Sequence, residues 1–247
     1  MKSLLCAARA ALIALSVIAG VANASVVIGG TRVVFPAQDG EVTLRLSNRG
    51  DRPALVEAWI DRGNPQSTPD KSDVPFLITP PLFRMEAHRD QSLRIIATQP
   101  QLPFDRESLF WLNVLEVPPK PSAAEAAGKN LLQFAIRSRL KLFYRPAQLT
   151  GDPVKAAGQL TWKAVSASHG VALEVHNPSP YYITISALSL DVGGKHTAAD
   201  TGMVAPFGTL QLAVKALTQV PASGTSLSYS VINDYGASTA YKGSTAP

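Results

Sequence analysis

The stretch LLQFAIRSRLKLFYR, residues 131–145, decides the fold. One series of alternate positions is mainly apolar: Leu132, Phe134, Ile136, Ser138, Leu140, Leu142 and Tyr144. The other series includes polar and basic residues: Gln133, Arg137, Arg139, Lys141 and Arg145. Alternation with a period of two predicts a β-strand with one apolar and one polar face. Neither Gly nor Pro interrupts the stretch before Pro146.

The predicted strand is longer than a small domain normally needs. Its fifteen residues would span roughly 50 Å, whereas strands in globular proteins usually contain about 5–6 residues. One interpretation is a long core strand of a β-sandwich. The alternative is that part of its apolar face serves another protein chain, and the pattern alone leaves both interpretations open.

The first residues have the features of a secretory signal peptide. Lys2 and Arg9 supply positive charge, residues 10–21 form an apolar run, and Ala22-Asn23-Ala24 is a small-residue cleavage site. We therefore expect residues 1–24 to be removed. The apolar run is too short for a membrane-spanning helix and no later segment resembles one, so we expect export without membrane insertion.

Charge and cysteine content narrow the partners and the compartment. The chain has 23 Lys and Arg against 18 Asp and Glu, and removal of Lys2 and Arg9 leaves 21 against 18, a net charge of +3. The net charge is small and the sequence has no dense run of Lys and Arg, and both observations argue against a nucleic-acid partner. The only cysteine, Cys6, lies in the predicted signal peptide. A mature protein without thiols or disulfides fits the bacterial periplasm.

Short predicted strands, separated by Gly and Pro, follow one another along the mature chain. They cover residues 26–35, 42–47, 55–60, 76–78, 91–97, 109–117 and 131–145, and then 159–165, 171–175, 181–190, 209–214 and 226–232. This pattern indicates an all-β protein made of antiparallel sandwiches. A linker near residues 147–153 divides it into domains at 25–147 and 148–247. A cis peptide bond at Thr79-Pro80 is left open.

The sequence contains no local motif for catalysis, metal binding or nucleotide binding. The histidines lack metal-ligand spacing: His88, His169, His176 and His196. There is no Gly-rich phosphate loop and no G-x-S-x-G elbow. We therefore expect no enzyme activity, no cofactor and no metal.

Five charged residues stand out because they lie on or beside predicted strands: Arg32, Lys141, Glu107, Arg145 and Asp234. Most strand Arg and Lys are solvated surface charges, but Arg32 and Lys141 could also converge on an anion. The other three present a choice between isolated surface charges and an ion-pair cluster between the two domains. Linear spacing does not decide between these interpretations.

Five motifs, in this order along the chain, resemble those of the PapD-like periplasmic pilus chaperones. They are Thr31-Arg32-Val33-Val34-Phe35, Asp105-Arg106-Glu107-Ser108-Leu109-Phe110-Trp111-Leu112-Asn113 with Pro118-Pro119, Lys141-Leu142-Phe143-Tyr144-Arg145-Pro146, Asn177-Pro178-Ser179-Pro180-Tyr181-Tyr182, and Ile232-Asn233-Asp234-Tyr235-Gly236. The resemblance covers essentially all of residues 25–247. It implies two immunoglobulin-like β-sandwich domains arranged at an angle around a cleft.

The resemblance also implies a function, that of an ATP-independent periplasmic chaperone for pilus (fimbrial) subunits. In this family the subunit is an incomplete sandwich, and the chaperone lends its long strand to fill the open groove before delivery to an outer-membrane usher. By position, Leu132, Phe134 and Ile136 are expected to enter that groove, with Leu140 as a further contact. An apolar edge of this kind also favours self-association of the free protein.

The same resemblance assigns roles to the five charged residues. Arg32 and Lys141 match the family's two cleft cations, which bind the terminal carboxylate of the subunit and so fix its register. Glu107, Arg145 and Asp234 match an interdomain charge cluster with a structural role. The loop at residues 120–130 is intermediate in length between the family's short-loop and long-loop branches, and the absence of a disulfide favours the short-loop branch.

Two other functions compete with the chaperone interpretation: that of a structural surface protein, such as an adhesin or a pilus subunit, and that of a hydrolase. A subunit's own donor strand would lie at its mature N-terminus, whereas the alternating strand here lies in mid-chain. A carbohydrate-binding protein should expose aromatic residues near polar loops, but Trp59, Trp111 and Trp162 lie in predicted strands. A hydrolase lacks any local motif, so the chaperone interpretation is favoured.

Overall fold

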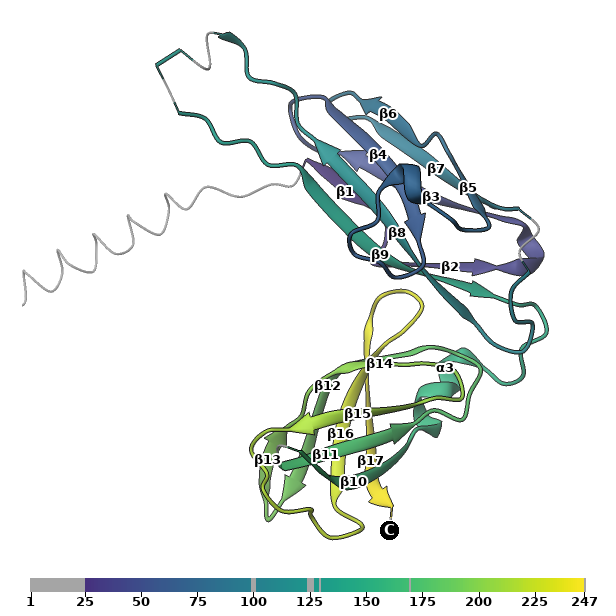
Figure 1. Ribbon diagram of the computed structural model, residues 1–247, viewed down its shortest axis with the longest axis vertical. Coiled ribbons are helices and arrows are strands. Elements are labelled where there is room, and N and C mark those ends of the chain that lie inside the picture. The colour runs from purple at the N-terminus through teal and green to yellow at the C-terminus, as the bar shows by residue number, and fades with distance from the viewer. Residues whose placement is uncertain (1–24, 99–100, 124–126, 129, 169, 247) are drawn as a thin grey trace, which may run out of the picture.

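The computed structural model describes residues 25–98, 101–123, 127–128, 130–168 and 170–246. The predicted signal peptide therefore lies outside the described residues. The described chain forms two domains of curled β-sheets, which follow each other along the chain and lie at an angle (Figure 1). The predicted all-β fold with two sandwich domains is confirmed.

The N-terminal domain consists of two sheets packed face to face. The four-stranded sheet has the order β1-β3-β7-β5, and the five-stranded sheet has the order β2-β9-β8-β4-β6. The strands are β1 (Val26–Ile28), β2 (Arg32–Pro36), β3 (Glu41–Asn48), β4 (Ala54–Asp61), β5 (Phe76–Thr79), β6 (Leu82–Met85), β7 (Asp90–Ala97), β8 (Ser108–Val117) and β9 (Ile136–Arg145). Two short 3-10 helices, η1 (Ala37–Asp39) and η2 (Pro69–Lys71), lie in the connections. The Thr79–Pro80 peptide bond is cis.

Alternation along the strands builds the core between these two sheets. Successive side chains of a strand point to opposite faces, so the apolar series turns inward and the polar series turns outward. The fully buried residues include Leu46 and Leu93 from one sheet and Leu112 and Leu142 from the other. Because β9 contributes Leu142 to this core, its C-terminal half is an integral strand of the domain.

The pair Gly29-Gly30 separates β1 from β2 and sends them to different sheets. β1 pairs with β3 in an antiparallel ladder, whereas β2 pairs with β9 in a parallel ladder. At the break, the Gly29 amide donates a hydrogen bond to the Arg45 carbonyl oxygen (2.8 Å), and a Cβ on Gly29 would lie only 2.9 Å from that oxygen. The close approach requires glycine, and the crossover brings Arg32 beside β9.

The C-terminal domain is a curled sheet of eight strands with the order β13-β12-β16-β17-β10-β11-β15, to which β14 adds by pairing with β12. The strands are β10 (Thr161–Ala167), β11 (Gly170–His176), β12 (Ile183–Val192), β13 (Lys195–Ala198), β14 (Gly202–Val204), β15 (Thr209–Val214), β16 (Ser226–Ile232) and β17 (Ser238–Ala246). The short helices α3 (Pro153–Ala156) and η3 (Ala157–Gln159) precede them. Trp162, Leu173, Ile185 and Leu227 belong to its separate core.

The predicted strand pattern was wrong in several places. The strand expected at residues 131–145 begins only at Ile136, and residues 131–135 have no strand hydrogen bonds. A strand needs a neighbouring backbone to pair with, and β8 ends at Val117, one residue beyond the partner of Ile136. The strand β17 was missed because its small polar residues show no apolar alternation, and the short strands β6, β13 and β14 were not predicted either.

Candidate functional site

One edge of β9 is open along half of its length. Residues 136–140 pair with β8 on one side only, whereas residues 141–144 lie between β8 and β2. Within the described residues no strand pairs with the free side of 136–140. The backbone N–H and C=O groups along this edge are therefore available to another strand.

Apolar side chains extend from this open edge into the segment before it. Ile136, Phe134 and Leu132 are 49%, 68% and 77% exposed, respectively. Their segment belongs to the connection between β8 and β9, which projects away from both sheets (Figure 1). These three large apolar side chains, spaced two residues apart, form a row that the described residues leave largely exposed.

Leu140 differs from the rest of this row. It is 6% exposed and belongs to the core of the N-terminal domain. Its side chain is thus already buried without a partner, because it lies where the two sheets of the sandwich still face each other. The exposed apolar row therefore consists of Leu132, Phe134 and Ile136.

Arg32 and Lys141, 109 positions apart in the sequence, are directly paired residues of β2 and β9. Residues paired across two strands project to the same face of a sheet, so the guanidinium and the ammonium group lie together at the start of β2. Both side chains reach the second domain. Arg32 Nη1 donates to the Ile232 carbonyl oxygen (3.0 Å), and Lys141 Nζ donates to Thr184 Oγ1 (3.0 Å).

The two cations are held in an unfavourable environment for charge. Burial lowers the pKa of Arg32, and the negative charges of Asp234 and Glu107 oppose this only in part. Burial and then the charge of Arg32 lower the pKa of Lys141. Arg32 Nε is buried without a hydrogen-bond acceptor, and no ion pair among the described residues includes either cation. An anion bound here would relieve both effects.

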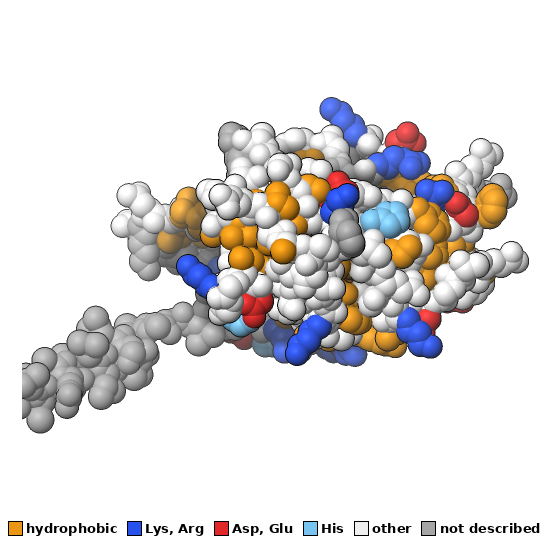
Figure 2. All heavy atoms as spheres, turned by 90° about the horizontal axis from the view of Figure 1, so that it is seen from below, with side chains coloured by type: hydrophobic (Ala, Val, Ile, Leu, Met, Phe, Trp, Pro, Cys, Tyr) orange, Lys and Arg blue, Asp and Glu red, His pale blue; other side chains and the backbone are white. Residues whose placement is uncertain are grey.

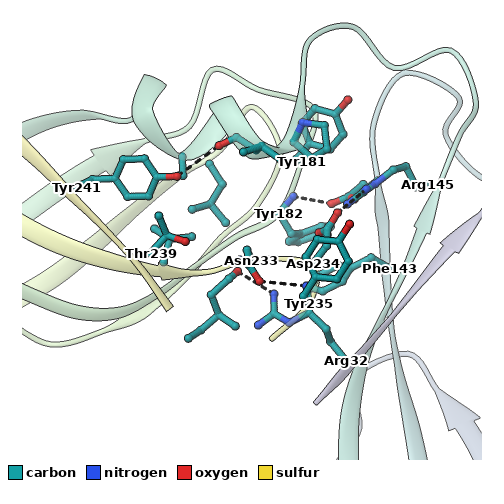
Figure 3. A pocket seen from close by; sticks show the side chains of 17 residues that line it. Arg32, Phe143, Arg145, Tyr181, Tyr182, Asn233, Asp234, Tyr235, Thr239 and Tyr241 are labelled. Carbon is teal, nitrogen blue, oxygen red and sulfur yellow. Dashed lines mark hydrogen bonds and ion pairs between the residues drawn. The ribbon is translucent and has the colours of Figure 1, made fainter. Parts of the chain in front are cut away.

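Glu107, Arg145 and Asp234 meet between the domains, and Figure 3 shows Arg145 beside Asp234. Arg145 Nε lies 2.7 Å from Glu107 Oε1, and its Nη1 and Nη2 atoms lie 2.7 and 3.0 Å from the two carboxylate oxygens of Asp234. Glu107, which is 3% exposed, also accepts the Tyr182 amide (2.7 Å). The cluster joins the residue before β8 and the end of β9 in one domain to the β11–β12 connection and the loop after β16 in the other.

Both carboxylates stabilise the charged guanidinium of Arg145. Burial disfavours the charged guanidinium, but the hydrogen bonds and charge of Asp234, together with those of Glu107, outweigh this and raise the pKa of Arg145. Burial also raises the pKa of Glu107 against the opposing charge of Arg145. Each buried charge therefore relies on its partners, which makes the cluster a joint between the domains.

A cavity of about 370 Å³ lies beside this joint, with Arg32 and Arg145 on one side and apolar residues of the second domain on the other (Figure 3). Its aromatic lining includes Phe143, Tyr182 and Tyr241. The guanidinium carbon of Arg32 lies 5.7 Å from the centre of the Phe143 ring. The cleft therefore combines an unpaired cation with aromatic surface.

The structure thus brings together two of the groups that the sequence singled out, the cation pair and the charge cluster, and it leaves the apolar row exposed. Sequence reasoning did not single out Asp61 and Asn113, which are buried polar residues beside β9. Asp61 directly follows an apolar run and Asn113 interrupts another, and this is the only local signal they give.

No group of three or more His, Cys, Asp or Glu side chains among the described residues could hold a metal ion. None of the helices in the described chain has the length and apolar character needed to cross a bilayer. Seen from the end of the C-terminal domain (Figure 2), Lys and Arg side chains are scattered among acidic and uncharged ones.

Comparison with known families explains this geometry. The family model described as "Pili and flagellar-assembly chaperone, PapD N-terminal domain" matches residues 25–150, and "Pili assembly chaperone PapD, C-terminal domain" matches residues 155–243. The chain belongs to the PapD-like pilus chaperone family. It is a family of chaperones rather than enzymes.

Individual relatives agree with this assignment. The chaperone protein FimB/FhaD of Bordetella pertussis is 45% identical over 236 residues, which cover 94% of this chain and 93% of that protein. The CupB2 chaperone of Pseudomonas aeruginosa has a crystal structure that matches with a TM-score of 0.74 and 41% identity, covering 89% of this chain and all of that chain. A chain in the structure of the Salmonella enterica SafA pilin in complex with the SafB chaperone matches with a TM-score of 0.72 and 32% identity. The match covers 91% of this chain and 98% of that chain.

Proposed function

We propose that this chaperone acts in the periplasm, binds pilus subunits by lending them the edge of β9, and passes them to an outer-membrane usher without using ATP. The observation that carries the proposal is the open edge at residues 136–140, which ends at the Arg32–Lys141 pair. A strand added to that edge would complete its ladder, and alternate apolar side chains would enter the partner's groove.

The geometry limits where the added strand can end. β2 occupies the same edge of β9 from Lys141 onward and runs parallel to β9. A partner strand on residues 136–140 must therefore stop where β2 begins. If it also runs parallel to β9, its last residue lies beside Arg32 and Lys141, and its terminal carboxylate supplies the missing anion.

This arrangement gives each part of the site a distinct role. Leu132, Phe134 and Ile136 supply apolar surface for the subunit's core, where full burial of one such side chain is worth about 1.5–3 kcal/mol. Arg32 and Lys141 fix the register, because a slip by one residue would turn the apolar row to the wrong face. Glu107, Arg145 and Asp234 hold the domains in the orientation that keeps the cation pair in the cleft.

Co-purification from the periplasm tests the proposal. Wild type, Arg32→Ala and Lys141→Ala would each be expressed with the pilus subunit encoded nearest to the chaperone. A stable complex with wild type alone, while both variants keep the wild-type circular dichroism spectrum, is the expected result. Accumulation of intact subunit without any complex would favour a structural protein instead, and unfolding of the variants would make the two cations structural residues.

A further inference from the structure

The polar face of β9 carries a buried network that the proposed function does not use. Arg137 and Arg139 lie on this face, two residues apart, and both approach the carboxylate of Asp61 at the end of β4. Asp61 is 4% exposed, and Asn113 of β8 is fully buried beside it. The network thus spans the three neighbouring strands β4, β8 and β9 on the outer side of the five-stranded sheet.

Asp61 is the centre of this network. Its Oδ1 atom accepts from Arg139 Nη2 (2.5 Å) and from the Gly63 amide (2.6 Å), and its Oδ2 atom accepts from Asn113 Nδ2 (2.8 Å). Burial alone would raise the pKa of Asp61, but these hydrogen bonds, with that of Ser67, outweigh it and lower the pKa. The carboxylate is therefore ionised and fully engaged at neutral pH.

Arg137 is tied to the same network by three partners. Its Nε and Nη2 atoms donate to Asn113 Oδ1 (3.0 and 2.7 Å), its Nη1 donates to the Pro65 carbonyl oxygen (2.9 Å), and its Nη2 reaches Ser67 Oγ (3.4 Å). Pro65 and Ser67 belong to the loop after β4. Arg137 thus connects the beginning of β9 both to β8 and to this loop.

Both arginines also stack on tryptophan rings. The guanidinium carbon of Arg137 lies 4.7 Å from the centre of the Trp59 ring, and that of Arg139 lies 4.4 Å from the centre of the Trp111 ring. Lys141 Nζ lies 6.0 Å from the same Trp111 ring. Stacked and hydrogen-bonded guanidinium groups have little rotational freedom, so the side chains on this face of β9 are fixed as far as the cation pair.

The network acts on the half of β9 that has least support from the sheet. Residues 136–140 have hydrogen bonds to β8 alone, and edge strands of this kind open more easily than strands paired on both sides. The side chains of Arg137 and Arg139 are bound on one face, so Ile136 and Ser138 are presented on the other. Because successive side chains point to opposite faces of a strand, holding the side chains of one face in place also determines where those of the other face point.

We propose that Asp61, Arg137 and Arg139 form a clamp that holds the open half of β9 in the register and facing that a subunit strand requires. The three are positioning residues that touch β4 and β8 rather than the subunit. This inference rests on the proposed function, since the clamp matters only if that edge receives a strand. It predicts that the clamp lowers the cost of binding by ordering the edge in advance.

Amide hydrogen exchange of the free protein is the first arm of the test. In Asp61→Asn, which preserves shape but removes the charge, those amides of residues 137–140 that are hydrogen-bonded to β8 should exchange about 10- to 100-fold faster, as expected for loss of a hydrogen bond to a charged group. Amides of β3, β7 and the C-terminal domain should keep their wild-type rates. Arg137→Gln should accelerate exchange at the same amides by a smaller factor. This second variant keeps the clamp testable if Asp61→Asn fails to fold.

Subunit capture is the second arm, with Asp200→Asn as the matched control, because its partner Lys215 forms an exposed ion pair far from β9. Both clamp variants should capture the co-expressed pilus subunit less well than the control, in the same order as their exchange rates. Unchanged exchange at residues 137–140, exchange that accelerates evenly through the domain, or faster exchange with normal capture would each overturn the clamp. If wild type captures no subunit, the proposed function fails, while the exchange arm still decides whether the clamp orders the edge.

Discussion

Replacement of Phe134 by Ala separates subunit binding from the stability of the chaperone. The side chain is 68% exposed, so it contributes little to the fold of the free protein. If the subunit buries what remains, about two thirds of the 1.5–3 kcal/mol for a large apolar side chain is at stake, or about 1–2 kcal/mol. Affinity for a subunit should therefore fall by roughly 5- to 30-fold.

Leu142→Ala is the matched control, because Leu142 belongs to the same alternating apolar series as Phe134 but is fully buried in β9. Truncation of a buried Leu usually costs about 2–5 kcal/mol of folding free energy. Urea unfolding of the two variants would measure this, and titration of a refolding pilus subunit with each chaperone, followed by size-exclusion chromatography, would measure complex formation. Phe134→Ala should weaken the complex at unchanged stability, and Leu142→Ala should lower stability. A stable Phe134→Ala variant with wild-type affinity would refute the role of the apolar row, and Phe134→Glu should block the complex altogether.

Two further predictions concern the charged groups of the cleft. Arg145→Met should lower the free energy of unfolding by about 3–5 kcal/mol, because it leaves Glu107 buried without its cation, and Glu107→Gln added to it should restore part of the loss in urea unfolding; an unchanged midpoint would show that the cluster is dispensable. Binding of a subunit carboxylate should raise the lowered pKa of Lys141, so affinity should fall as the pH rises through the free-state pKa, below the ordinary lysine value. Lys141→Arg should lack that fall, and an identical pH profile in the variant would assign the titration to another group.

Alternation in the sequence predicted β9 because the strand's two faces meet different environments. Leu142 and Phe143 are buried on opposite faces, and Lys141 projects from the polar face as expected. Residues 131–135 continue the same alternation but do not form a strand. Alternation decides which side chains share a face, but a strand forms only where another backbone pairs with it. The described residues place no such backbone beside residues 131–135.

The site could be predicted from the sequence only through resemblance. Nothing in the spacing of Arg32 and Lys141 shows that β2 crosses over to pair with β9, since that depends on the break at Gly29-Gly30. The clamp was missed for the same reason. Asp61, Arg137 and Arg139 each look like an ordinary strand charge, and only the order β9-β8-β4 in the folded sheet brings them together.

Disulfide trapping of the complex tests the central claim, that β9 receives a parallel subunit strand whose carboxylate lies at Arg32 and Lys141. The only cysteine of the chain is Cys6, in the predicted signal peptide, so single cysteines introduced at Leu132, Phe134 or Ile136 would report without background. Each would be combined with cysteines along the last strand of the subunit. We predict that Ile136→Cys forms a disulfide nearer to the subunit's C-terminus than Leu132→Cys does, with Phe134→Cys between them. The reverse order, or no preference along the strand, would contradict the account.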